Sequence, residues 1–522
     1  MRYAIFFISM LSAMANISSQ TVNYAEHVAP IIYKNCAPCH RSGEIAPFPL
    51  TNYDEVKNYG SFIKYVTEIK YMPPWKPEQG VREYQKQNFL TQDEINMIAK
   101  WVDQGMERGD PAKEPPFPIF PTGSQIGTPD LVVSFAQSYV HKGTGVDEYR
   151  YFVIPTGLTE DKYLTALELR PGNKKIVHHT LVWADSTSAS RDQDAATPEY
   201  GYEGSSSGIA GQLNNQLPGY VPGQKPIVYT DGLAMKIPKG SDLLLQMHYA
   251  PSPVDEVDST TINLFFSSEK PKRFVQSYVM LPIPGILQND VFLIPPNQVK
   301  EFHGMITLPI AVTFLGLAPH MHLLGTKWEI YATLPNGNRI EAMKINDWDF
   351  NWQGSYNFVK PIVLPAGSQI HAFATYDNTT DNPNNPNNPP KYISWGEKTS
   401  DEMYYLPLIY MTYKPGDENL EFKDVLSNGN VNLDFSSDKI FPIFPNPAQD
   451  KITVPFTIRL PQEVTIEVTD INGKVLITKY NKQYADNGMF KVEIGIGELP
   501  AGTYYVNVKT TNNQMTEKFI KI

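Results

Sequence analysis

The segment from Ile176 to Trp183 reads IVHHTLVW, and the segment from Leu243 to Tyr249 reads LLLQMHY. Both are short apolar runs of the kind that forms buried strands. The run from Tyr163 to Leu169 has the same character, and Gly and Pro turns separate such runs over residues 123–425. No regular alternation with helices is present, which argues against a parallel α/β sheet. A seam near residues 268–275 divides this region into two predicted sandwiches.

The length and composition of the chain indicate its general class. The protein has 522 residues, 41% of them hydrophobic and 19% charged, which is typical of several globular domains. Its formal net charge of -11 argues against nucleic acid or an anionic membrane as the main partner.

The N-terminus predicts export. Arg2 precedes an apolar run from Ala4 to Leu11, and Ala13-Met14-Ala15 offers a cleavage site, so residues 1–20 resemble a signal peptide. A buried first helix or strand is the alternative. The run is too short to span a membrane, and no later stretch is long enough. Both cysteines lie in one CxxCH motif, so we expect a disulfide-free protein that passes through the periplasm.

A helical unit is predicted over residues 21–112. Thr91 can cap a helix that continues to Met106, and Glu94 stands three residues later, as in a capping box. A proline-rich linker then begins at Pro111.

The motif Cys36-Ala37-Pro38-Cys39-His40 predicts a covalent haem within this unit. Two thiols three positions apart can add to one haem, and the adjacent His40 can bind the iron. A chance motif, a zinc site or a redox pair are alternatives. Met72, in the sequence YMPPW, is the candidate for the sixth ligand, although it could also be a packing residue.

Most of the other histidines fall in metal-ligand patterns. In His320-Met321-His322, residues i and i+2 point to one face of a strand and can grip one metal, and the thioether of Met403 suits Cu(I). His178 and His179 point to opposite faces of a regular strand, so they need a kink to share a metal with His248. Either pattern taken alone could consist of ordinary core or surface histidines.

The order of these segments resembles the type II copper, ascorbate-dependent monooxygenases, the family of the peptidylglycine α-hydroxylating and dopamine β-monooxygenases. The resemblance covers about residues 125–425. It implies two jelly-roll-like domains whose coppers face each other across a solvent-filled gap. It also implies an electron-storing copper and a second copper, the M site, where O2 and substrate react. The implied ligands are His178, His179 and His248 for the first copper, called the H site, and His320, His322 and Met403 for the M site.

Two positions depart from that family. Peptide amidation uses an arginine two residues before the HxH motif, where this chain has Ala318, and Pro407 replaces a tyrosine four residues after the methionine. Peptide C-termini are therefore poor substrate candidates.

Two further resemblances complete the predicted organisation. Residues 21–112 resemble a class I cytochrome c. The motifs FPNPA from Phe444, DINGK from Asp470, LPAGTYY from Leu499 and the terminal KFIKI resemble a type A sorting domain of the type IX secretion system, which implies an outer envelope of the Bacteroidetes type. A generic accessory β-sandwich is the alternative. Asn472-Gly473 also predicts a hairpin turn in this unit.

The predicted fold class is therefore multidomain. It combines an α-helical cytochrome c domain, two β-sandwich copper domains and a small Ig-like C-terminal β-sandwich. The predicted boundaries are a signal peptide at 1–20, a cytochrome c-like domain at 21–112, an H-site domain at 123–270, an M-site domain at 271–425 and a sorting domain at 440–522.

The sequence thus predicts a secreted or cell-surface copper monooxygenase with two copper ions and one covalent haem c. The expected partners are O2, a small organic C–H substrate, the type IX secretion machinery and an external electron donor, either an ascorbate-like reductant or a redox protein. The haem would pass electrons to His178, His179 and His248 first. The alternatives are a non-catalytic haem and copper electron carrier and a copper-binding or storage protein.

Overall fold

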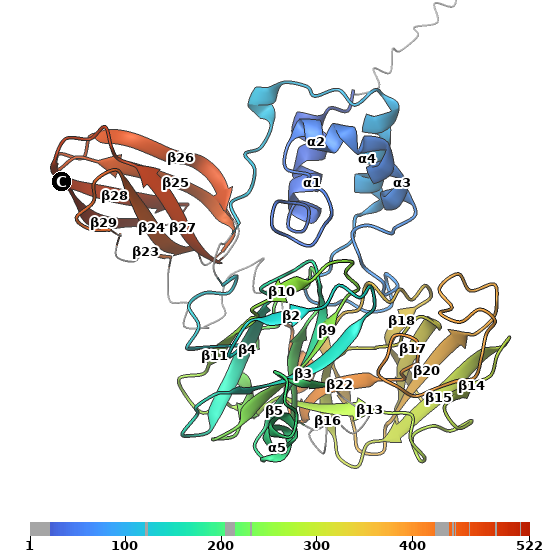
Figure 1. Cartoon of the computed structure of the whole chain (residues 1–522). Coiled ribbons are helices and arrows are strands. Elements are labelled where there is room, and N and C mark those ends of the chain that lie inside the picture. The colour runs from blue at the N-terminus through green and yellow to red at the C-terminus, as the bar shows by residue number, and fades with distance from the viewer. Residues whose placement is uncertain are drawn as a thin grey trace, which may run out of the picture.

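The computed structural model describes residues 21–120, 124–203, 215–229, 232–422, 438–440, 443, 445–458, 460–485, 488–511 and 513–522. The predicted signal peptide lies outside the described residues. Figure 1 shows the N-terminal helices above two neighbouring groups of strands, with the last strands in a separate group. Within the described residues, no helix is long and apolar enough to cross a bilayer.

The predicted fold class is wrong, because no sizeable α-helical cytochrome domain is evident in the described part of the chain. Strands account for 41% of the structure and helices for 11%. The five α-helices among the described residues are all short: α1 (Ala29–Asn35), α2 (Tyr53–Asn58), α3 (Gly60–Glu68), α4 (Gln92–Asp103) and α5 (Ala189–Ala195). A π-helical turn, η1 (Tyr24–Val28), precedes α1.

The segment between α3 and α4 shows why the helical prediction fails. Pro73 and Pro74 cannot continue a helix, and the chain from Trp75 to Gln85 packs on strands of the second sandwich. Tyr84 is buried in that sandwich's core, and its hydroxyl donates to the carbonyl of Ala342 over 2.8 Å. The backbone N–H of Glu78 donates to the carbonyl of Lys344, which lies on the same strand as Ala342. Residues that were predicted to belong to a helical unit therefore pack on the second sandwich instead.

The predicted capping box is confirmed at α4. The Thr91 side chain accepts from the backbone N–H of Glu94, and the Glu94 carboxylate accepts from that of Thr91. The helix ends at Asp103 rather than Met106, because Gly105 and Met106 have φ values of 94° and 60°, outside the helical region.

The first sandwich consists of two five-stranded sheets around one apolar core. One sheet has the order β1 (Leu131–Ser134), β11 (Thr261–Phe266), β4 (Lys162–Arg170), β8 (Leu233–Ile237), β12 (Arg273–Phe274). The other has the order β6 (Tyr202–Glu203), β3 (Glu148–Pro155), β9 (Asp242–Tyr249), β5 (Val177–Asp185), β7 (Gln216–Tyr220). A small pair joins β10 (Glu256–Asp258) to β2 (Tyr139–His141). Every residue of β9 is buried, which explains its continuous apolar sequence.

The second sandwich consists of two four-stranded sheets. One has the order β13 (Gln276–Met280), β22 (Leu406–Thr412), β16 (Val312–Leu317), β19 (Tyr356–Leu364). The other has the order β15 (Val299–Thr307), β20 (Gln369–Asp377), β17 (Gly325–Thr333), β18 (Arg339–Ile345), and a small pair joins β14 (Leu293–Ile294) to β21 (Ile393–Ser394). Leu315 and Ile409 belong to the core of the first sandwich, so the two sandwiches pack directly together.

The C-terminal strands form a separate small sandwich with its own core. Its sheets have the orders β23 (Lys439–Ile440), β24 (Lys451–Ile458), β27 (Gly488–Gly495) and β26 (Val475–Ala485), β25 (Gln462–Thr469), β28 (Gly502–Thr510), β29 (Gln514–Lys521). The predicted turn at Asn472-Gly473 is confirmed, because it connects β25 to β26 with Gly473 at a φ of 81°.

Candidate metal centres

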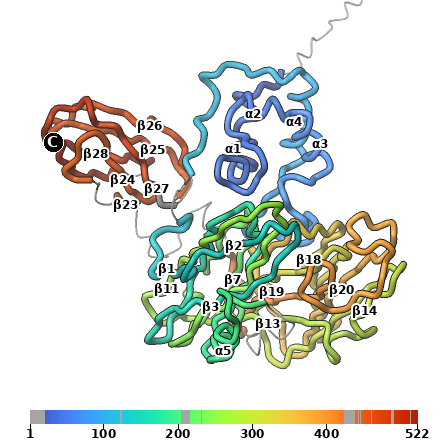
Figure 2. Tube along the Cα trace, viewed as in Figure 1, coloured from blue at the N-terminus to red at the C-terminus, as the bar shows by residue number. Residues whose placement is uncertain are grey.

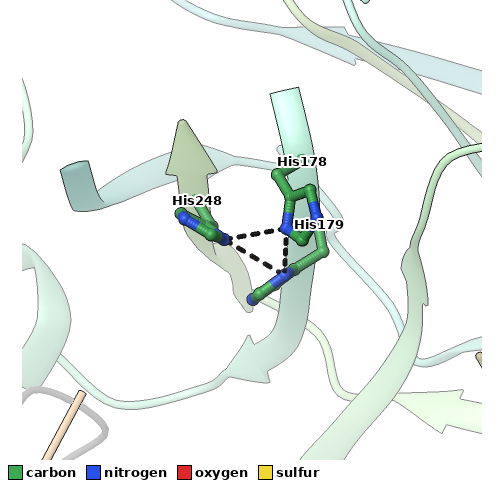
Figure 3. Close-up of side chains that lie close together, drawn as sticks. All are labelled: His178, His179 and His248. Carbon is green, nitrogen blue, oxygen red and sulfur yellow. Dashed lines mark hydrogen bonds between the residues drawn. The ribbon is translucent and has the colours of Figure 1, made fainter. Parts of the chain in front are cut away.

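Three histidines of the first sandwich converge on one point. His178 and His179 lie on β5, and His248 lies opposite them on β9. The register slips between Val177 and His179, so a β-bulge supplies the kink that adjacent histidines need to face one partner. Figure 3 shows the three Nδ1 atoms pointing toward one another. They lie 3.2, 3.0 and 3.3 Å apart. The point equidistant from them lies roughly 1.8 Å from each, close to the length of a metal–imidazole bond.

The protonation of these rings suits a cation at that point. Burial, with a contribution from His248, lowers the pKa of His178 to about 3. Burial also lowers the pKa of His179 and of His248. The His248 Nε2–H donates to Asp147 over 2.6 Å, which leaves the Nδ1 lone pair for the cluster. The three Nδ1 atoms lie within hydrogen-bond distance of one another, and neutral rings with their protons on Nε2 would direct three lone pairs at a metal ion placed between them.

The second cluster lies in a connection rather than on a regular strand. His320, Met321 and His322 follow β16, and only His320 makes a bridge, with Tyr405. The rings of His320 and His322 are 5.1 Å apart and nearly perpendicular. The segment that carries Met403 runs beside this connection, because Tyr405 pairs with His320 and Glu402 accepts the backbone N–H of His322. Met403 is only 6% exposed.

Hydrogen bonds leave the Nε2 atoms of this cluster available. The His322 Nδ1–H donates to the carbonyl of Asp401 over 3.2 Å, and the His320 Nδ1–H donates to Gln353 Oε1. His322 Nε2 is buried without a hydrogen-bond partner. Burial lowers the pKa of His320 to about 4 and that of His322 well below its usual range. A buried, unpaired lone pair is costly, and a metal ion would satisfy it.

Glu402 organises this cluster, and sequence analysis missed it. Its carboxyl group accepts the backbone N–H groups of His322 (2.9 Å), Leu324 (2.7 Å) and Met403 (3.1 Å). It therefore ties the HxH connection to the chain that carries the thioether. Burial raises the pKa of Glu402 to about 8, against the effect of these backbone donors. Only its position next to Met403 in the sequence could have pointed to Glu402 as part of this cluster.

The two histidine clusters lie against each other. The ring centroids of His179 and His320 are 5.5 Å apart. Phe350 lies 5.4 Å from His178 and 5.6 Å from His322, so its ring contacts both clusters. The solvent-filled gap that the family resemblance implies is therefore absent between these described side chains.

Hydrogen bonds between the sandwiches explain this closure. Tyr149 stacks on His248 at 4.2 Å, and its hydroxyl lies 2.9 Å from Thr399 Oγ1 of the second sandwich. Tyr151 donates to Glu397 over 3.2 Å. None of these contacts could be inferred from the sequence, because the partners are about 250 residues apart.

The CxxCH motif forms the turn after α1. The His40 Nδ1–H donates to the carbonyl of Phe48 over 3.0 Å, and the two rings are 4.8 Å apart. Phe48 stacks on Tyr59, and Tyr59 and Phe62 are 38% and 52% exposed. This uncovered apolar face beside a histidine with an anchored Nδ1 fits a haem. Cys36 and Cys39 are both free thiols.

Met72 follows α3, and its backbone N–H donates to the carbonyl of Val66. The role of Met72 as the sixth ligand stays a prediction.

The CxxCH turn and the histidine clusters share a cavity of about 270 Å³. Cys39, His179 and His320 all line it. Glu44 pairs with Lys174 of the first sandwich over 2.6 Å, and a Cβ placed on Gly223 would lie 3.3 Å from the Cys39 sulfur. The turn is therefore docked on the first sandwich, and Figure 2 shows α1 above β2 in this view.

Comparison with known proteins identifies the C-terminal unit. Residues 442–522 match the family described as "Secretion system C-terminal sorting domain". This is a type IX secretion sorting domain, so the protein is exported and is either secreted or attached to the cell surface. No copper monooxygenase or cytochrome c family matches, and no curated protein matches the chain.

Likeness to solved structures is weak. A β-glucuronidase of Faecalibacterium prausnitzii shares 12% identity, with 44% of this chain and 38% of that chain covered and a TM-score of 0.14. A β-D-glucuronidase of Dictyoglomus thermophilum also shares 12%, with 48% and 44% covered and a TM-score of 0.16. The VP2 subviral particle of infectious bursal disease virus shares 10%, with 56% and 75% covered and a TM-score of 0.16. The chain spans less than half the length of both glucuronidases. These likenesses say nothing about function.

Proposed function

We propose that this exported protein is a copper-dependent monooxygenase that hydroxylates a C–H bond of a small organic substrate with O2. Electrons would reach its two copper ions through a c-type haem bound at Cys36, Cys39 and His40. The observation that carries the proposal is the juxtaposition of two largely buried histidine clusters. Three Nδ1 atoms converge on one point in the first, and His322 Nε2 is buried without a hydrogen-bond partner in the second. Their rings approach to 5.5 Å. A structural protein would have no reason to bury such groups.

The chain's own residues have separate tasks in this scheme. Copper, when bound, supplies the one-electron chemistry that O2 activation requires. His178, His179 and His248 would hold one ion, and Asp147 keeps His248 in the tautomer that can do so. His320, His322 and Met403 would hold the other, and a thioether among the ligands favours reduced copper. His179, His248, His322 and Met403 are buried, which would limit the access of water to the reaction.

The docked CxxCH turn supports the haem as the internal electron donor. The haem would be held by short helices and an exposed apolar face, without the cytochrome c domain that the sequence predicted. Cys39 lines the same cavity as His179. Tyr220 on β7 pairs with Thr180, the residue after His179, and also lines this cavity, which places a short stretch of protein between the turn and the H-site histidines. An external reductant or redox protein would reduce the haem.

The test is oxygen consumption by the copper-loaded, haem-containing protein, with product analysis across a panel of small C–H donors. His320→Ala is expected to abolish hydroxylated product. His303→Ala is the matched control, because His303 makes a 3.0 Å hydrogen bond to His371 on another strand and belongs to neither cluster. Redox cycling of haem and copper without product would support an electron carrier. Copper uptake that leaves the haem's redox state unchanged would support a storage protein.

A further inference from the structure

We propose that the cavity beside His320 binds an uncharged, largely apolar organic molecule, and that the Gln216 carboxamide holds a hydrogen-bonding group of that molecule. This inference rests on the proposed function, since it names the substrate class of the same site. It excludes the ionic substrates that a charged wall would select.

The wall next to His320 carries no charge. Ala318 and Pro407 line the cavity there, and the Ala318 N–H donates to the Pro407 carbonyl over 3.0 Å, so their backbones are already paired. Tyr405 also lines the cavity and pairs with His320 through a β-bridge. A carboxylate or ammonium group placed here would lose its hydration without gaining an opposite charge, which is strongly unfavourable.

Gln216 is the polar group of this wall that has spare hydrogen-bonding capacity. It is 8% exposed and lines the cavity. Its Oε1 accepts from the Tyr405 hydroxyl over 3.0 Å, which fixes the carboxamide beside the M-site chain. Within the part of the chain that the structure describes, no residue is recorded as accepting from its Nε2. A buried amide donor that faces a cavity calls for an acceptor from a ligand, such as a hydroxyl, ether or carbonyl oxygen.

Charged residues farther along the cavity form ion pairs or hydrogen bonds with other residues of the protein. Glu44 pairs with Arg41 over 2.8 Å and with Lys174 over 2.6 Å. Lys86 donates to a backbone carbonyl, and Glu168 accepts from two donors. Glu44 and Lys174 pair across the contact between the CxxCH turn and the first sandwich, and Glu168 accepts from donors within that sandwich, so these charged groups already have partners of their own.

The size of the cavity supports a small ligand. Its volume of about 270 Å³ lies just below the range of roughly 300–1,000 Å³ that is usual for ligand pockets. Leu217 and Ile409 contribute apolar surface to its lining. The apolar lining and the Gln216 amide donor together favour a compact apolar molecule with one oxygen acceptor.

The experiment compares three probes that share one carbon skeleton: 2-phenylethanol, phenethylamine and phenylacetate. Their binding to the copper- and haem-loaded protein is measured by titration calorimetry, and O2 uptake is measured separately. We expect 2-phenylethanol to bind at least about tenfold more tightly than either ion. Gln216→Leu should weaken its binding about tenfold, and Gln216→Glu should shift the preference to phenethylamine.

Gln276→Leu is the matched control for Gln216→Leu. Gln276 accepts from the Tyr410 hydroxyl over 3.0 Å in the same way, but at an exposed position outside the cavity. Thermal unfolding of both variants shows whether any loss of binding comes from loss of fold.

Several outcomes would overturn the proposal: tighter binding of either ion, equal binding by the two leucine variants, or no binding of any probe. The proposed function can fail independently. Selective binding of 2-phenylethanol with no oxygen uptake would support the substrate class and contradict the monooxygenase.

Discussion

Replacing Glu402 by Gln tests whether this carboxyl group holds the second metal cluster together. Above the Glu402 pKa of about 8, the carboxylate accepts three backbone N–H groups on its two oxygens, so the comparison with the variant is made above that pH. A glutamine that keeps its oxygen toward His322 and Met403 turns an NH2 group toward the N–H of Leu324. One buried donor then loses its acceptor, which costs roughly 1–3 kcal/mol.

The expected effect can be measured in two ways. At about 2–4 °C per kcal/mol, the loss lowers the unfolding temperature by roughly 2–12 °C. Copper content should also fall from two ions toward one per chain, because the HxH connection is no longer held against the Met403 chain. Calorimetry and metal analysis would record both changes.

The matched control is Glu418→Gln. Glu418 also accepts a backbone N–H, that of Gly416 over 3.1 Å, but at an exposed position. We expect it to change the unfolding temperature little, since water can replace a lost hydrogen bond there. Wild-type copper content together with a wild-type unfolding temperature in Glu402→Gln would refute the reasoning.

Three other perturbations have defined outcomes. Asp147→Ala removes the acceptor that holds His248, so copper affinity at that cluster should fall about 10- to 100-fold in metal titrations; an unchanged affinity would contradict this. Burial raises the pKa of Glu397 to about 7, above its usual value near 4.5, so its contribution to stability is complete below about pH 4.5 and is lost as the pH rises toward 7. Glu397→Gln should flatten that part of the curve of unfolding free energy against pH, and a persistent slope would assign it to another group. Deletion of residues 442–522 should leave the protein in the periplasm, as cell fractionation would show, whereas normal secretion would mean that the sorting domain is dispensable.

Local features could be predicted well from the sequence where the residues that form them lie in one short segment. The capping box of Thr91 and Glu94 and the turn at Gly473 are both present, because each depends on contacts within five residues. The sorting domain was recognised from its motifs for the same reason. The α-helical cytochrome domain was wrong, because the residues after Pro73 gain more by burying Tyr84 in the second sandwich than by extending a helix.

The sequence by itself determined which side chains are available for metal binding. It identified the six candidate copper ligands and the CxxCH motif, because the type and order of residues decide which side chains can bind a metal. The tertiary structure decided how they meet. The bulge at His178, the Glu402 carboxyl group and the contact of Phe350 with both clusters depend on pairings between distant segments. Such pairings follow from packing of whole sheets, and no local pattern of residues encodes them.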